Sequence, residues 1–170
     1  MMATLGACER RAAFSECRSG ATAVEFAFIA PIFILILVVW IDLGMTLLEQ
    51  SVLDSATLRA ARSVKIGATT TSAAFKTTLC AYLYGVVPCA SIKYTVQSGT
   101  SFSALSTTIT TDSANALTNM SFSIGSGGSD VLVQVGFTRT LFAPWLSSLF
   151  GKNGYLLILS TVAFQNEPYS

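Results

Sequence analysis

The longest apolar run of the chain covers residues 21–41, and it predicts a helix that crosses a membrane. A bilayer core is about 30 Å thick and needs about 20 apolar residues of helix, which this run supplies. Pro31 lies inside the run, lacks an N–H and predicts a kink there. Glu25 lies near its start, although a carboxylate within lipid costs about 2.5–3.5 kcal/mol. We therefore expect Glu25 to have a specific role.

After this run the pattern changes to that of a helix with one apolar face, which extends the predicted helix to residue 66. Gly67 predicts its end, because Arg62 and Lys65 occupy the last turns, where cations complement the helix dipole. We expect the apolar face to pack against the rest of the chain, with Gln50, Asp54, Ala61 and Lys65 roughly opposite. The apolar face consists of Met45, Leu48, Val52, Ala56 and Ala60.

Residues 67–170 predict a small domain with one further helix and several strands. Residues 69–72 form a linker that offers an N-cap to a helix over residues 73–84. The Ser/Thr-rich segment 98–118 is expected to be mostly loop. The predicted fold class is α+β, in which a long N-terminal helix packs on a small antiparallel sheet of three or four strands. Alternating hydrophobic and polar positions place these strands at residues 92–97, 120–124, 131–137 and 156–164.

Basic residues predict that the N-terminus lies in the cytoplasm. Arg10, Arg11 and Arg18 precede the apolar run, whereas the next basic residue after it is Arg59. By the positive-inside rule, the chain crosses once and the remainder lies outside. The predicted organisation is a cytoplasmic leader over residues 1–20, a transmembrane helix over 21–41, its extramembrane continuation over 42–66, and a periplasmic or extracellular α+β domain over 67–170.

A removable signal peptide is the alternative to a retained membrane helix. Such a peptide has an apolar core of about 7–15 residues followed by a cleavage site of small residues. Here the apolar run is longer, and Asp42 and Leu43 interrupt the expected site. We therefore favour a retained helix. Asp42 is then interpreted as a polar residue at the membrane interface, and Trp40 as an interfacial anchor.

Composition and charge reduce the number of function classes that fit the chain. Hydrophobic residues make up 52% of the chain and charged residues only 11%, which favours a membrane-tethered protein over a free cytosolic one. The net charge is +1 without a basic cluster after the span, so nucleic-acid binding lacks its usual electrostatic signature. Histidine is absent, and neither a Gly-x-Ser-x-Gly nor a Ser-x-x-Lys pattern is present. We expect no enzyme activity, no metal and no cofactor.

The four cysteines divide between the two predicted compartments. Cys8 and Cys17 lie in the leader, where thiols stay reduced, and two thiols without further ligands are a weak metal signal. Cys80 and Cys89 lie in the exported part, where disulfides persist, and we expect them to be linked. Two unpaired buried cysteines remain the alternative.

The spacing of Gly20 and Glu25 suggests proteolytic processing at the membrane face. A small residue suits a cut between Gly20 and Ala21, and Glu25 would then be the fifth residue of the mature chain. There its carboxylate could meet the new terminal ammonium of a neighbouring subunit in a low dielectric. The alternative is an interfacial carboxylate that reaches back to the lipid headgroups, and physical reasoning alone does not separate the two.

The stretch from Ser19 to Pro31, Ser-Gly-Ala-Thr-Ala-Val-Glu-Phe-Ala-Phe-Ile-Ala-Pro, resembles the N-terminal signature of the TadE/TadG-like family. Members of this family are minor pilin-like components of the bacterial tight-adherence (Flp-type) pilus. The resemblance implies cleavage after Gly20 by a prepilin peptidase and use of Glu25 in assembly with other pilin-like subunits and the Tad assembly platform. Phe26, where major Flp pilins usually carry tyrosine, and the length of the chain favour a minor component.

The function hypothesis is therefore a TadE-like minor pseudopilin that primes, caps or regulates a pilus used for surface attachment. It would be held in the bacterial inner membrane, in contact with lipid, either permanently or until it enters the extracellular pilus. The alternative is an uncleaved, permanently anchored periplasmic scaffold or binding protein. The aromatic residues Phe142, Trp145 and Phe150 are a candidate docking patch for a partner, although such residues more often cap a small core.

Overall fold

The computed structural model describes residues 18–142 and 151–168, and within the first helix it describes the side chains from Ala23 on. Most of the predicted leader, including Cys8 and Cys17, lies outside the described residues, as do Trp145 and Phe150 of the aromatic run. The chain divides into two compact units, which we call unit 1, residues 1–41, and unit 2, residues 42–170. Each is described by itself.

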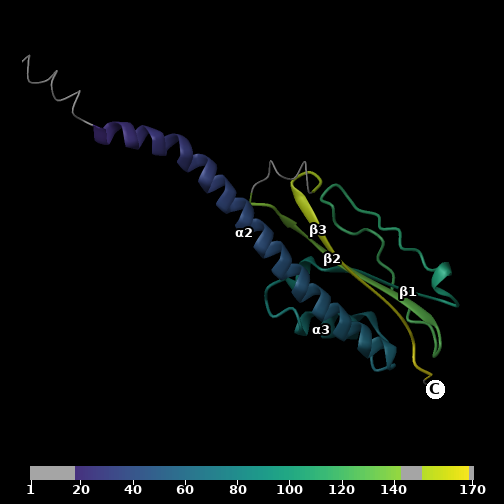
Figure 1. Cartoon of the computed structure of the whole chain (residues 1–170). Helices are drawn as coiled ribbons and strands as arrows, with labels where there is room; N and C mark the ends of the chain where they lie inside the picture. Colours follow the sequence, from purple (N-terminus) through teal and green to yellow (C-terminus); the bar gives the residue numbers. More distant parts are fainter. Residues whose placement is uncertain (1–17, 143–150, 169–170) are drawn as a thin grey trace, which may run out of the picture. The chain divides into compact units, whose positions relative to one another are not determined.

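The first helix, α2, runs from Arg18 to Lys65 and includes Pro31 (Figure 1). It begins three residues before the predicted start at Ala21 and ends one residue before the predicted end at residue 66. Gly67 terminates it as expected, because its φ of 73° leaves the helical region at no steric cost. The N–H of Gly67 donates to the carbonyl of Val64 at 2.9 Å.

The second helix, α3, runs from Ser72 to Ala81 and is shorter than the predicted 73–84. Thr71 is its N-cap, since its hydroxyl accepts a hydrogen bond from the N–H of Ala74 at 3.3 Å. After α3 the chain turns and enters the 3₁₀ helix η1, Cys89–Ser91. The structure contains the disulfide between Cys80 and Cys89, whose Cα atoms lie 5.5 Å apart.

Three antiparallel strands form the sheet, in the order β1-β2-β3. Strand β1 is Lys93–Gly99, β2 is Asp130–Thr140 and β3 is Tyr155–Gln165. The predicted α+β fold class is thus confirmed. The fourth predicted strand, 120–124, is not a strand of this sheet. It contributes only an isolated parallel bridge, between Phe122 and Val96 at the free edge of β1.

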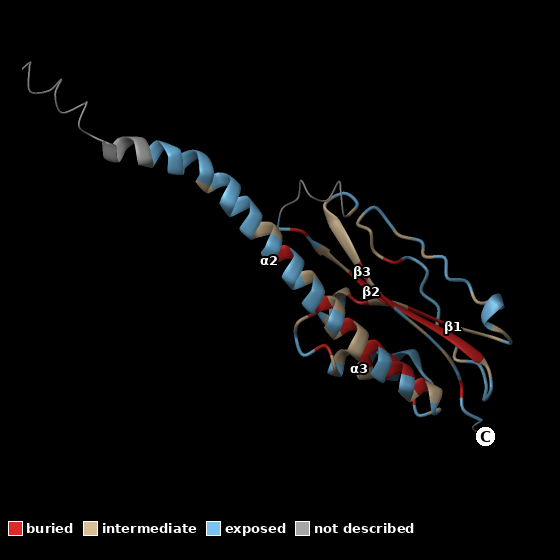
Figure 2. Ribbon diagram, in the orientation of Figure 1, coloured by how far each residue is buried: buried red, intermediate tan, exposed pale blue. Residues whose placement is uncertain are grey.

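The core of unit 2 lies between one face of the sheet and the helices α2 and α3 (Figure 2). The predicted apolar stripe of α2 was partly wrong. Met45 and Leu48 are 38% and 48% exposed, whereas Ala61, expected on the opposite side, is buried. The face of α2 that packs on the sheet therefore differs from the predicted face and consists of residues later in the helix. The core residues of α2 are Leu53, Ala56, Ala60, Ala61 and Val64, and those of β2 are Val131, Val133, Val135 and Phe137.

The long segment between β1 and β2, which contains the 3₁₀ helix η2, Phe102–Ala104, covers the second face of the sheet over β2. The side chain of Gln134 on β2 is buried and donates to the carbonyl of Thr107 at 3.3 Å. Leu117 from the same segment is also buried, and an added side chain at Gly136 would meet it at 3.0 Å. Strand β2 is therefore buried on both faces.

The disulfide generates the first prediction. Cys80→Ala should lower the free energy of unfolding of unit 2 by about 2.5–3 kcal/mol, because the small loop is no longer closed in the unfolded chain. Denaturant unfolding of the full chain in detergent measures this. Reduction should lower the wild-type midpoint and leave the Cys80→Ala midpoint unchanged. Equal midpoints for the oxidised wild type and the variant would contradict the prediction.

Candidate functional site

The predicted processing and assembly residues all lie in the first part of α2. Gly20 and Ala21 fall in its first turn, and Glu25 and Pro31 follow one and three turns later. Glu25 and Pro31 are both exposed in unit 1. No basic side chain forms an ion pair with Glu25 among the residues that the structure describes. The structure thus places these residues on one helix and gives Glu25 no charged partner from its own described chain.

The helix around Glu25 is apolar and uncovered. The candidate membrane span begins at Ala23. Its apolar stretch of 18 residues has a mean hydropathy of 2.7, and no residue of that stretch is buried within the chain. Phe26, Phe28 and Trp40 are 71%, 75% and 69% exposed. Large apolar side chains with this exposure need lipid or other protein to cover them. The segment is therefore compatible with a single-pass membrane anchor.

Unit 2 begins with a buried cluster of charges, which we call the charge cluster: Asp42, Glu49 and Arg139. Asp42 and Glu49 lie two turns apart on the same face of α2, and Arg139 lies near the end of β2. Arg139 pairs with the Asp42 carboxylate, and its Nη1 lies 3.3 Å from Oε2 of Glu49. The three side chains are only 6%, 10% and 11% exposed. The cluster joins α2 to the sheet.

Arg139 makes further contacts that fix its position. Its Nη2 donates to the backbone carbonyl of Asp42 at 3.4 Å. Its guanidinium lies 5.6 Å from the ring centre of Phe142, the described member of the predicted aromatic run, which is 66% exposed. Phe142 thus partly shields the charge cluster.

The electrostatics of the charge cluster reflect its burial. Burial raises the pKa of Glu49 above that of an ordinary carboxyl, and burial lowers the pKa of Arg139. Both shifts have one cause, since removal from water disfavours the charged form of either group. Charges held this far from water persist only when they are paired, and two carboxylates share one guanidinium here.

The charge cluster adds a role that the sequence did not predict for Asp42. Asp42 was interpreted as a polar residue at the membrane interface, and the structure shows that its side chain is buried in an ion pair. Glu49 and Arg139 were not recognised as a pair, because 90 residues separate them. One signal was available. Arg139 follows Val135 and Phe137 at the two-residue period of a strand, so it belongs to the face of β2 that packs on the helices.

Among the described residues, no group of three or more His, Cys, Asp and Glu side chains could hold a metal ion.

The family model of TadE-like proteins matches residues 20–62. This match supports the assignment of the chain to the TadE-like family. The matched segment begins at Gly20 and includes Glu25, Asp42 and Glu49, but it ends before α3 and the sheet. Comparisons with curated proteins and with solved structures found no match.

The charge cluster generates the second prediction. Arg139→Met should lower the free energy of unfolding by about 3–5 kcal/mol, because two carboxylates then stay buried without a cation. The triple variant Asp42→Leu, Glu49→Leu and Arg139→Met should recover most of this loss, since no buried charge remains. Denaturant unfolding measures both, and Lys152→Met, at an exposed site, is the matched control.

The loss in Arg139→Met should also shrink as the pH falls. Without Arg139 the buried carboxyls protonate more readily in the folded than in the unfolded chain, so acid favours the folded state of this variant. Two results would show that the pairing of these charges is not what stabilises unit 2. One is a loss of unfolding free energy below 1 kcal/mol in Arg139→Met near neutral pH, and the other is an equal loss in the triple variant.

Proposed function

From its assignment to the TadE-like family, we propose that the chain is a minor pilin-like subunit of a tight-adherence pilus. It is cleaved after Gly20, held in the bacterial inner membrane by the apolar part of α2, and assembled through Glu25. Its N-terminus lies in the cytoplasm and unit 2 on the periplasmic side. TadE-like proteins are associated with the Tad pilus as structural components, and this association supports a role in assembly.

One observation carries the proposal: Glu25 is an exposed carboxylate without a described partner, on an apolar helix within the TadE-like segment. A carboxylate in that position is costly in lipid unless it is paired. Cleavage after Gly20 creates an ammonium at Ala21, and the terminal ammonium of a neighbouring subunit would be the complementary charge for Glu25. A charge-assisted hydrogen bond between them would be strong in a low dielectric.

The charge cluster supports retention of the apolar helix. A signal peptidase would cut after the apolar run, in the region of Asp42 and Leu43. Such a cut would interrupt α2 and separate Asp42 from Arg139, which would leave the guanidinium with fewer charged partners in a buried site. Cleavage after Gly20 removes none of the residues that hold unit 2 together.

The exposed apolar side chains of α2 also suggest what the chain contacts. The exposed side chains Phe26, Phe28 and Ile29 contact lipid before assembly and other pilin-like helices after it, because both environments cover apolar surface. The Tad assembly platform and a prepilin peptidase are the proposed machinery that moves the subunit from the first environment to the second.

The third prediction concerns cleavage. In cells with an active prepilin peptidase, the mature wild-type chain should begin at Ala21, and Gly20→Val should keep residues 1–20 because the larger side chain crowds the cut site. Intact mass of the membrane-extracted protein measures this. Ala23→Val, a similar increase in bulk within α2, should be cut normally. A wild-type chain that keeps residues 1–20 would favour a permanently anchored, uncleaved scaffold instead.

The fourth prediction separates assembly from anchoring. Glu25→Ala and Glu25→Gln should both abolish piliation although the protein is present, cut and folded, because both lose the charge that pairs with the terminal ammonium. Membrane insertion should be equal or better. Glu25→Asp keeps the charge and should restore part of the function.

The measurement is the yield of sheared pili together with surface attachment, at matched membrane levels of each variant. Glu167→Gln removes a carboxylate near the C-terminus and is the control for a general effect of net charge. Normal piliation by Glu25→Ala and Glu25→Gln would refute the assembly role and leave Glu25 as an interfacial carboxylate.

A further inference from the structure

A hollow of about 320 Å³ lies in unit 2 where the start of α3, the start of β1 and the segment around Phe122 meet. Its volume is at the lower end of the range for small-molecule sites, about 300–1,000 Å³. The side chains that matter below are Ser72, Lys76, Lys93, Tyr94, Met120 and Phe122.

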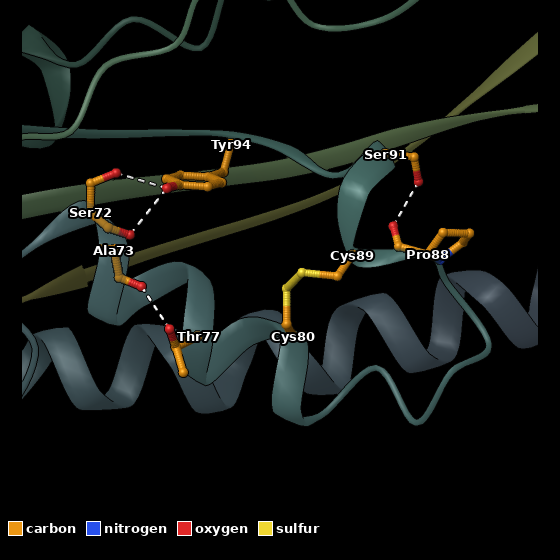
Figure 3. The surroundings of a disulfide bond; sticks show 8 residues. All are labelled: Ser72, Ala73, Thr77, Cys80, Pro88, Cys89, Ser91 and Tyr94. Atoms are coloured by element: carbon orange, nitrogen blue, oxygen red, sulfur yellow. Dashed lines mark hydrogen bonds between the residues drawn. A yellow bond between two sulfur atoms is a disulfide. The ribbon is translucent and has the colours of Figure 1, made fainter.

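Two cross-links hold the walls of this hollow in place (Figure 3). At one end the hydroxyls of Ser72 and Tyr94 lie 2.7 Å apart, and the Tyr94 hydroxyl donates to the Ser72 carbonyl at 3.1 Å. At the other end the disulfide joins Cys80 on α3 to Cys89. The helix and the returning chain are thus joined at two points.

Each cross-linked wall carries one lysine. Lys76 lies on α3, four residues before Cys80, and Lys93 begins β1, four residues after Cys89. They are the charged residues of the lining, which contains no carboxylate. Among the described residues neither lysine forms a salt bridge. Two cations at one hollow without a counter-charge are suited to an anionic ligand.

The remaining wall is apolar and largely aromatic. The buried ring of Phe75 lies 5.1 Å from the ring centre of Tyr94 and 5.8 Å from that of Phe122, so it supports both from within the core. Met120, which is 60% exposed, extends this apolar wall at the surface. A ligand here meets charge from two sides and an apolar face from a third.

We propose that this hollow binds an acidic sugar unit, a pyranose that carries a carboxylate. The carboxylate accepts hydrogen bonds from Lys76 and Lys93, and the C–H face of the ring lies against Tyr94, Phe122 and Met120. A free inorganic anion would use the lysines but leave the apolar wall uncovered. This assignment is independent of the proposed pilus role, because it uses no residue of the TadE-like segment.

The test is calorimetric titration of the full chain in non-ionic detergent with a dimer of galacturonic acid. A neutral hexose dimer, inorganic phosphate and an acidic peptide serve as comparison probes. The uronate should bind saturably and weaken as salt rises. Lys76→Gln and Lys93→Gln should each weaken it by about tenfold or more, since each removes a charged hydrogen bond. Met120→Ala should weaken the uronate and leave phosphate unaffected.

Lys152→Gln, which removes one positive charge outside the hollow, is the matched control and should leave uronate binding unchanged. Circular dichroism and the intact disulfide establish that each variant is folded. Absence of saturable uronate binding to the wild type overturns the proposal, and so does an equal effect of Lys152→Gln. Phosphate binding as tight as that of the uronate, or lysine-dependent binding of the acidic peptide alone, overturns the sugar assignment.

Discussion

Arg139 is buried and must be paired, and this constraint selects the face of α2 that meets the sheet near Asp42 and Glu49. A buried guanidinium must meet carboxylates, and both carboxylates come from one face of α2. That requirement turns the face of Asp42 and Glu49 toward the sheet, and the core residues Leu53 and Ala60 follow on the same face. At the other end of α2 the N–H of Glu167 donates to the carbonyl of Lys65 at 3.0 Å. The helix is thus fixed on the sheet at both ends of its packed region, by charge at one and by backbone at the other.

The same constraint determines what α2 leaves uncovered. With the carboxylates turned inward, the apolar side chains Leu47, Leu48 and Leu58 are 62%, 48% and 57% exposed on the remaining surface. Gly44, among them, has open space around it. In the proposed pilus this surface is available to neighbouring helices, together with the apolar segment that precedes it. The buried charges and the exposed leucines therefore have one cause, which is the orientation of α2 about its own axis.

Local pattern predicted the two helices and the three strands of the sheet, because these depend mainly on nearby residues. The period of two located β1, β2 and β3, Gly67 marked the end of α2, and the threonines before α3 supplied its cap.

Local pattern failed where a residue distant in the sequence determines what a side chain or segment contacts. The partner of Asp42 and Glu49 is 97 and 90 residues away, and the apolar face was assigned to Met45 and Leu48 from local periodicity alone. Residues 120–124 alternate like a strand, but the edge of β1 accepts only one bridge from them. The hollow left no local signal, because its two lysines are 17 positions apart in the sequence and their walls meet only in the fold.

The two proposals rest on different parts of the chain, and this separation has a physical basis. In the first proposal, assembly would use the segment 20–62, where the TadE-like match lies and where α2 carries exposed apolar side chains. Ligand binding would use α3, β1 and the segment around Phe122, whose positions are fixed by the disulfide and by the aromatic contacts of Phe75. A helix that must pack with many neighbours can vary little in shape, whereas a cross-linked hollow can change its lining without disturbing that packing. A subunit built in this way can carry a recognition site on a common assembly helix, because neither function requires residues of the other.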